Sequence, residues 1–427
     1  MNDEHILRIK EPFDTDESIR RYEHLEYRPI TGTNLNTTGE IRIIIESQDE
    51  VFHPANSYLL IEGDLTKEEG DAPYINTDAV ALANNGPMFL FSNVKYELSG
   101  HEIESINHPG PATTMKGLLK YAEPYEKGQG LNQCWAIDTA TTADLAGNKG
   151  FSLRHSYIID HPTPKGSFSF IIPLKHIFGF ADDYDKVTYG LRHVLTLVRQ
   201  GNNDAIFRAA AAAAGKVKLS KISWVMPRVL PNDQERLSLM KTIEAKSEVK
   251  VGFRAHYCDT ISVPESTSFS WRLTARTSPE SPRWLIVAFQ SARANDQLKN
   301  PATFDHCSAV NVWVDLNGNP YPNLQQNSDF DKQQIATVYN AIPEFLSSYY
   351  GVHTQSSISP FYFKDLYPLY VIDISKQPER IKYGVMDMTL RATFKNAVAA
   401  GTQAFALVIS DRILTFKSDG SKMNVTV

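Results

Sequence analysis

The sequence has few of the residues on which disulfide scaffolds and zinc sites depend. It contains 3 cysteines in 427 residues, Cys134, Cys258 and Cys307. They are too few and too far apart for a disulfide framework or a zinc knuckle. Because free cysteine is usually buried, we expect three reduced and mostly buried thiols.

Long apolar runs are also missing. None approaches the ~20 residues that a membrane-spanning helix needs. The first ten residues, MNDEHILRIK, carry charge where a signal peptide needs an apolar stretch. We therefore expect a protein made without a signal peptide.

Positive charge does not accumulate anywhere along the chain. The net charge is −6, and no segment forms a basic arm. An electrostatic hold on nucleic acid requires clustered lysine and arginine. The sequence therefore predicts no direct, sequence-specific binding of nucleic acid.

Catalytic and metal-binding motifs are absent as well. The 12 histidines include no His-x-His pair and no His-Glu-x-x-His. The nearest arrangement, His101 with His108, has the wrong spacing for two ligands on one helical turn and is typical of a polar hairpin edge. Gly215-Lys216 resembles the end of a phosphate loop, but Ala210 occupies the position that needs glycine. We predict no catalytic residue, no cofactor and no metal ligand.

One acidic cluster leaves a question open. Asp182, Asp183 and Asp185 follow one another between two expected strands. Carboxylates suit hard cations such as calcium, but ligands must converge in space, which one cluster cannot establish. A solvated loop is the favoured interpretation, and ion binding remains the alternative.

The residues that are present indicate strands, most clearly in residues 281–322. The run from Trp284 to Phe289 is apolar throughout, as in a strand covered on both faces. Residues 310–316 alternate apolar and polar side chains, which is typical of a strand with one buried face. Asn317-Gly318 predicts a turn. We expect Pro320 and Pro322 to prevent further strand pairing.

Similar segments recur along the whole chain. The expected strands are 41–46, 57–65, 88–99, 101–106, 167–174, 188–199, 216–229, 248–257, 267–275, 369–375, 385–394 and 404–416. The expected helices are 111–122, 232–246 with an Asn232 cap, and 333–350 with a kink or restart at Pro343. The six alanines at 209–214 favour a short helix, and residues 129–150 read as an exposed loop.

This order of elements predicts an all-β protein of two tandem jelly-roll β-sandwich domains with short inserted helices. The expected parts are an N-terminal arm at 1–27, a first jelly roll at 28–230 and a second at 231–427, with Pro231 at the boundary. Aromatic residues crowd at 349–350, 361–363 and 367–370. They suit either subunit interfaces or the core, and both interpretations stay open.

Several short segments, taken in order, resemble one family. In the first half they are 35–43 (LNTTGEIRI), 53–59 (HPANSYL), 91–98 (FSNVKYEL) and 103–106 (IESI). In the second half they are 222–227 (ISWVMP), 282–284 (PRW), 304–307 (FDHC), 329–332 (DFDK) and 348–351 (SYYG). Over residues 28 to 410 the chain resembles the double jelly-roll major capsid proteins of Polinton elements and the related adintoviruses, including copies integrated in animal genomes.

The resemblance implies a structural protein of the virion that is not an enzyme. Members of this family are expected to form homotrimers, which are pseudo-hexameric capsomers that tile an icosahedral shell. The implied partners are neighbouring capsomers, a single jelly-roll penton protein and minor capsid proteins. The alternative is a carbohydrate-binding or glycan-hydrolysing β-sandwich protein, which the 5 tryptophans, 19 tyrosines and 21 phenylalanines would suit.

Overall fold

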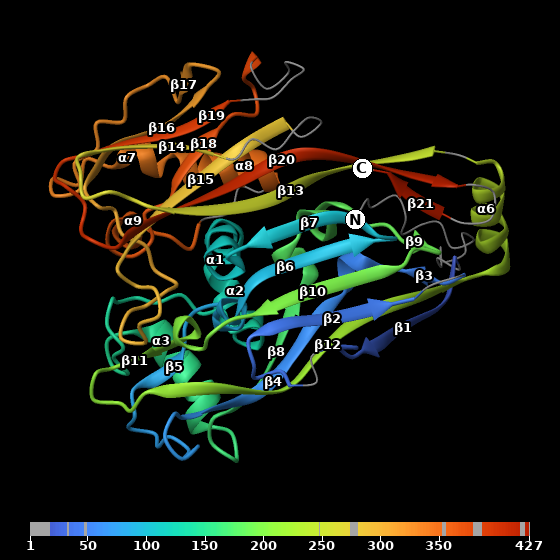
Figure 1. The fold of residues 1–427 in the computed structure, drawn as a ribbon, viewed down its shortest axis with the longest axis horizontal. Helices are drawn as coiled ribbons and strands as arrows, with labels where there is room; N and C mark the ends of the chain where they lie inside the picture. Colours follow the sequence, from blue (N-terminus) through green and yellow to red (C-terminus); the bar gives the residue numbers. More distant parts are fainter. Residues whose placement is uncertain are drawn as a thin grey trace, which may run out of the picture.

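The computed structural model describes residues 18–31, 34–46, 49–246, 248–273, 281–351, 356–378, 387–418 and 423–426. Figure 1 shows two β-sandwiches side by side, the first in blue to green and the second in yellow to red. Their strands run roughly along the long axis of the molecule. Within the described residues, no helix is long and apolar enough to cross a membrane.

The first sandwich consists of two antiparallel sheets. One contains, in spatial order, β1 (Ile19–Tyr27), β12 (Gly215–Pro231), β4 (Tyr58–Lys67) and β8 (Ser167–Pro173), and the short strands β3 (Val51–Phe52) and β9 (Thr188–Tyr189) extend it. The other contains β2 (Gly39–Ile45), β10 (His193–Arg199), β6 (Phe91–Leu98) and β7 (His101–Asn107). A small separate ribbon pairs β5 (Val80–Leu82) with β11 (Ile206–Arg208).

The second sandwich repeats this plan. One sheet contains β13 (Glu248–Ser262), β20 (Thr402–Ser418), β15 (Ser281–Ser291) and β18 (Tyr370–Asp373), with β21 (Met423–Thr426) added to β20. The other contains β14 (Ser268–Arg272), β19 (Met388–Phe394), β16 (Ala309–Leu316) and β17 (Asn319–Tyr321).

The two sandwiches share one strand order. If the main strands of each sandwich are numbered 1 to 8 along the chain, its two sheets read 1-8-3-6 and 2-7-4-5 in both cases. This interleaved order is that of a jelly roll, in which two Greek keys bury one core between two sheets. The predicted fold class, two tandem jelly rolls with short inserted helices, is therefore confirmed.

Helices occupy equivalent places in the two halves. After the fifth strand of the first sandwich comes α1 (Pro109–Lys120), and after the fifth strand of the second come α7 (Ala336–Tyr339) and α8 (Ala341–Tyr350). Helix α6 (Asp233–Glu244) connects the sandwiches at one end of the molecule (Figure 1). The shorter helices are α2 (Glu123–Lys127), α3 (Lys149–His155), α4 (Leu174–Ile177), α5 (Gly179–Asp183) and α9 (Pro360–Asp365).

Local signals in the sequence explain where the helices begin. The Asn232 side chain accepts a hydrogen bond from the Glu235 backbone N–H at 2.8 Å, which is the predicted cap of α6. Pro343 lies in the first turn of α8, after the break between α7 and α8. Proline is tolerated there because first-turn N–H groups have no partner within the helix. The predicted restart at this proline is confirmed.

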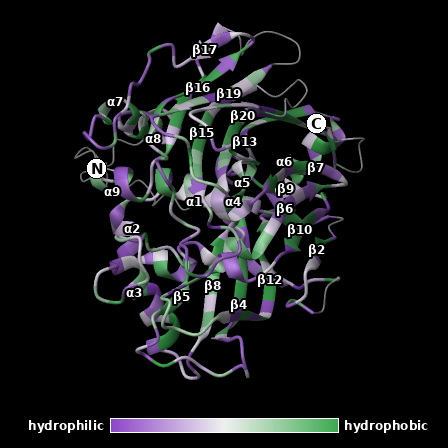
Figure 2. Cartoon of the chain, turned by 60° about the vertical axis from the view of Figure 1, so that its left-hand side comes forward, coloured by the Kyte–Doolittle hydropathy of each residue, from purple (hydrophilic) through white to green (hydrophobic). Residues whose placement is uncertain are grey.

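The core follows from the apolar patterns of the strands. Trp284 to Phe289 of β15 are all buried, and Val312, Val314 and Leu316 of β16 face the core. Ala309 is buried as well, and Asn311, Trp313 and Asp315 are half-buried, as the alternation predicted. Val310 is half-buried although the alternation placed it on the core face. Figure 2 shows hydrophobic residues gathered on the strands and hydrophilic ones on the connecting loops. One connected set of buried apolar residues spans both sandwiches.

The predicted N-terminal arm is wrong from Ile19 onward. Residues 19–27 form β1, which pairs with β12 from Ile19–Pro231 to Tyr27–Trp224. β1 is the edge strand of its sheet, so most of its side chains are exposed. The usual run of buried apolar residues is therefore missing from its sequence. The rest of the arm, residues 1–17, lies outside the described residues.

The exposed loop predicted for residues 129–150 is wrong for most of its first half. Trp135, Ala136, Ile137 and Asp138 are buried. The Trp135 ring lies so close to α1 that a Cβ on Gly117 would come within 2.3 Å of it. The polar residues of this segment satisfy buried groups: the Asp138 carboxylate, for example, accepts from Arg154 Nη2 at 2.8 Å. Its composition therefore reflects internal hydrogen bonding rather than contact with water.

Two further local predictions are wrong. The alanines at 209–214 form a turn, not a helix, because their backbone groups bond to other segments; the Ala209 N–H, for example, donates to the Ala79 carbonyl at 2.9 Å.

Pro320 does not stop strand pairing, since Asn319–Tyr321 form β17 against β16. β17 is an edge strand, where a missing N–H costs no ladder hydrogen bond.

Candidate functional surface: the junction between the sandwiches

The two sandwiches meet through different faces. From the first come β7, α1 and α5, and from the second come β13, β20 and α8. The two corresponding helices, α1 and α8, contact each other. Figure 1 shows β7 and α1 lying between the bodies of the two sandwiches. We call this surface the junction.

A buried carboxylate lies at the centre of the junction. Glu104 of β7 is 1% exposed. It accepts backbone hydrogen bonds from Gly179 and Phe180 of α5, both at 3.0 Å, and from His256 of β13 at 2.7 Å. Burial raises the pKa of Glu104 to about 7, although the three N–H donors favour the charged form. One side chain thereby joins elements of both sandwiches.

The partner of this carboxylate is a buried histidine. His256 Nδ1 lies 3.5 Å from Glu104 Oε1, and its Nε2 lies 3.1 Å from the Tyr349 hydroxyl of α8. Burial lowers the pKa of His256 well below its ordinary value, and the nearby Lys116 ammonium acts in the same direction. His256 is therefore neutral at physiological pH and acts as a hydrogen-bonding group.

An ion pair closes the same region. Asp183 of α5 accepts from Arg254 of β13 through Nε and through the backbone N–H, both at 2.8 Å, and also through Nη2. The guanidinium carbon of Arg254 lies 3.7 Å from the ring centre of Tyr349, a cation–π contact. Burial by itself would lower the pKa of Arg254. The hydrogen bonds and the negative charge of Asp183 have the larger effect, so the pKa of Arg254 is raised. Arg254 thus binds both sandwiches at once.

Asp182 is also paired. Its carboxylate lies 2.6 Å from Lys120 Nζ and 3.3 Å from Lys116 Nζ, both on α1. Burial by itself would raise the pKa of Asp182, but the two ammonium groups hold it well below its ordinary value. Burial lowers the pKa of Lys120 to about 8. Asp182 fixes α1 against α5, next to the junction.

The solvated loop predicted for the three aspartates is therefore wrong for Asp182 and Asp183. Only Asp185 is exposed, and it lies 3.3 Å from Lys186. The three carboxylates have separate cationic partners instead of a common centre. Within the described residues, no group of three or more histidine, cysteine, aspartate or glutamate side chains is arranged to hold a metal ion.

A second arginine crosses the junction nearby. Arg412 of β20 donates from Nη2 to the Glu102 carbonyl at 3.2 Å and from Nη1 to the Ile103 carbonyl, both on β7. His108, which precedes α1, packs edge-on against Phe405 of β20 with ring centres 6.2 Å apart. β7 is thus held to the second sandwich along its length.

The structure also places the other residues that the sequence singled out. Cys134 and Cys258 are buried, Cys307 is half-buried, and all three are free; burial raises the pKa of each thiol. His101 is exposed at the β6–β7 hairpin, as expected for a polar edge. In the aromatic segments, Tyr349, Phe363, Tyr367 and Tyr370 belong to the core, whereas Phe361 is 67% exposed.

Sequence reasoning did not find Glu104, Arg254, His256 or Arg412. The available signal was a charged or polar residue inside an apolar strand: Glu104 lies between Ile103 and Ile106. Such a residue is costly to bury without a partner, so it indicates a polar contact inside the protein. The partner, however, lies in the other half of the chain.

The fold and the sequence together identify the family. Residues 80–414 match the double jelly roll-like domain. This chain belongs to the double jelly roll-like family. No curated protein matches it in sequence.

Several solved structures of viral proteins share this architecture. A chain in the cryo-electron microscopy structure of the Sputnik virophage is 9% identical with a TM-score of 0.60, covering 100% of this chain and 92% of its own. The Faustovirus major capsid protein is 10% identical with a TM-score of 0.57, covering 97% and 93%. The mavirus major capsid protein is 11% identical with a TM-score of 0.53, covering 95% and 90%. At these identities the similarity is one of fold.

Proposed function

We propose that this chain is the major capsid subunit of a Polinton- or adintovirus-like DNA virus, or of an integrated relative. Three copies form a pseudo-hexameric capsomer, and capsomers tile an icosahedral shell. The role is structural and not enzymatic, and the protein resides in the virion. The double jelly-roll fold, shared with the Faustovirus and mavirus major capsid proteins, supports this role.

We also propose two modules that meet at Pro231: residues 28–230 together with β1, and residues 231–427. The strand order supports this division, since each module contains its own complete set of eight strands. The expected partners are neighbouring capsomers, a single jelly-roll penton protein and minor capsid proteins.

The junction is the observation that carries the proposal. It is heterologous: the fifth strand and following helix of one module face the first and last strands of a like-built module. When two unlike faces meet in this way, the first module keeps one unused face and the second module keeps the complementary one. Repeating the same contact between copies gives a closed ring if the rotation from one module to the next divides a full turn evenly. Three chains supply six modules, so a ring of three would present pseudo-sixfold symmetry.

The free faces of one chain can be named. The counterpart of β13 is β1, the most exposed edge strand of the first module, where Ile19 is 46% and Tyr22 37% exposed. The counterpart of β7 is β17. The counterpart of α1 is α8, which already takes part in the junction. We propose that β1 of one copy meets β17 of the next. A stable contact of this kind buries on the order of 2,000 Å².

Mass measurement and negative-stain microscopy of the purified full-length protein test the proposal. We expect a trimer with threefold particles, and Tyr22→Glu is expected to shift the population to monomer without changing the far-UV circular dichroism spectrum. Leu237→Glu is the matched control, because Leu237 is 62% exposed and lies on α6, outside β1. A parent protein that stays monomeric at all concentrations would contradict the capsid role.

The second candidate, a glycan-binding or glycan-hydrolysing sandwich protein, has one observation in its favour. It is a surface pocket on the second module, bounded in part by β17.

A further inference from the structure

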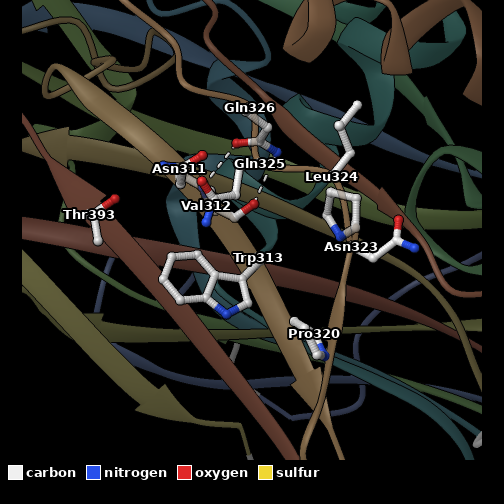
Figure 3. A pocket seen from close by; sticks show the side chains of 10 residues that line it. Asn311, Val312, Trp313, Pro320, Asn323, Leu324, Gln325, Gln326 and Thr393 are labelled. Atoms are coloured by element: carbon white, nitrogen blue, oxygen red, sulfur yellow. Dashed lines mark hydrogen bonds between the residues drawn. The ribbon is translucent and has the colours of Figure 1, made fainter.

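A pocket lies on the outer face of the second module, remote from the junction. It is about 330 Å³ in volume and is bounded by β16, by Thr393 of β19 and by residues 320–326, which begin in β17. This volume is at the small end of ligand pockets, which span roughly 300–1,000 Å³. Figure 3 shows the Trp313 ring broadside at its centre, with Thr393 on one side and Pro320 on the other.

The lining carries no charge. Apart from Trp313, its side chains are the amides of asparagine and glutamine, one threonine, prolines and two aliphatic residues. A charged ligand would lose hydration here without gaining an opposite charge. The lining therefore favours a neutral ligand that offers both donors and acceptors, as amides do themselves.

Trp313 forms the floor and is fixed in place. Its Nε1–H donates to Asp315 Oδ1 at 3.2 Å, and Asp315 is in turn paired with Arg391 on the neighbouring strand. The ring is half-buried. The face of an aromatic ring is negative, so it attracts C–H groups that carry partial positive charge. The C–H face of a pyranose ring has this character.

The opposite wall is held rigidly against β16. The Gln326 side chain pairs with both backbone groups of Val312, accepting at 2.9 Å and donating at 3.0 Å. The Asn327 N–H donates to Asn311 Oδ1 at 3.0 Å, and the Ser328 N–H donates to the Val310 carbonyl at 2.9 Å. The pocket is thus preformed, which lowers the entropic cost of binding.

Polar groups around the rim remain available. Among the residues that the structure describes, none forms a hydrogen bond with the side chains of Asn323, Gln325 or Thr393. The Asn311 side chain uses its oxygen for Asn327, which leaves its NH₂ group as a donor. Neutral donors and acceptors thus surround an aromatic floor.

We propose that this pocket binds a neutral carbohydrate, with one pyranose ring stacked on Trp313 and its hydroxyls bonded to Asn323, Gln325 and Thr393. A proline-rich peptide also stacks on tryptophan, but it has few donors and would leave the amide oxygens of the asparagine and glutamine side chains unmatched. The proposal does not rest on the capsid role.

A glycan array of neutral and anionic oligosaccharides, probed with the full-length protein, tests the inference. Lactose, maltotriose, N,N′-diacetylchitobiose and 3′-sialyllactose are then titrated by saturation-transfer NMR. We expect at least one neutral glycan to bind, and Trp313→Ala to weaken that binding by roughly tenfold or more, about the contribution of one aromatic stacking contact. Gln325→Ala, at an exposed position that cannot affect folding strongly, is expected to weaken it by several-fold.

Phe361→Ala is the matched control, because it removes an exposed aromatic ring outside the pocket and should leave binding unchanged. The proposal is overturned if no neutral glycan on the array binds, or if Trp313→Ala and Gln325→Ala bind as the parent does. Preference for sialylated over neutral glycans overturns it as well, and so does an oligoproline peptide that binds at Trp313 where no sugar does.

Discussion

Individual buried side chains determine how the junction responds to pH. Glu104 and His256 face each other, with Lys116, Asp182, Arg254 and Tyr349 around them. The pKa of Glu104, about 7, lies above its ordinary value of 4.5. This group therefore contributes stability that is fully present below pH 4.5 and is lost as the pH rises through 7. His256, with a lowered pKa, contributes stability that is lost as the pH falls below 6.5.

We predict that Glu104→Gln and His256→Asn change the pH dependence of stability in opposite directions. We define the stability difference as the free energy of unfolding of the parent minus that of the variant. For Glu104→Gln this difference should decline between pH 4.5 and 7, by at most about 3 kcal/mol. For His256→Asn, the free energy of unfolding of the parent minus that of the variant should rise with pH up to 6.5. Urea unfolding at a series of pH values measures both. Differences that do not vary with pH would show that the pair does not titrate on unfolding.

The ion pair across the junction gives a second test on single residues. Asp183 and Arg254 are largely shielded from solvent, so their attraction is weakly screened. A double-mutant cycle with Asp183→Asn and Arg254→Met should give a coupling energy of about 1–3 kcal/mol. The control cycle uses Glu248 and Lys417, which pair at 2.7 Å but are about half exposed. That cycle should show no measurable coupling, and equal couplings in the two cycles would contradict the special role of the junction.

The partners of these residues explain why the sequence did not reveal the junction. Glu104 and His256 are 152 positions apart, and each lies in a strand whose own pattern is ordinary. A single sequence shows that a buried charge needs a partner, but it does not show which distant residue supplies it. The junction depends on how the two finished sandwiches face each other.

Whole strands and turns were more predictable, because their signals are local. The alternation in residues 310–316 and the Asn317-Gly318 turn located β16 and the turn that follows it. In the alanine run, tertiary hydrogen bonds replaced local preference. The Ala213 carbonyl, for example, accepts from the Tyr74 hydroxyl at 3.0 Å within the alanine run that favours helix.

The turn between β16 and β17 gives a prediction for a single element. Asn317 and Gly318 have φ of 48° and 89°, as a tight hairpin turn requires. A Cβ on Gly318 would meet nothing within 4 Å, so the cost of Gly318→Ala is conformational, about 1 kcal/mol. Gly252 in β13 has equal space and no positive φ, so Gly252→Ala should be neutral or stabilising by up to ~1 kcal/mol. Chemical denaturation of both variants measures the contrast, and equal effects would refute it.

At the scale of the whole molecule, the two sandwiches share one connected apolar core, and polar contacts reinforce the junction. Two domains joined only by a linker unfold independently, whereas strong coupling makes them unfold together.

We predict one calorimetric transition for the parent protein. We predict two transitions for the double variant Arg254→Met, Arg412→Met, because each arginine binds β7 or α5 to the second sandwich. Lys417→Met, which changes an exposed side chain within the second sandwich, is the control and should keep one transition. All scans are compared at one protein concentration, since assembly also shifts the transition temperature. Two transitions in the parent would mean that the sandwiches fold as independent units, and the junction would then be too weak to serve as the template for contacts between copies.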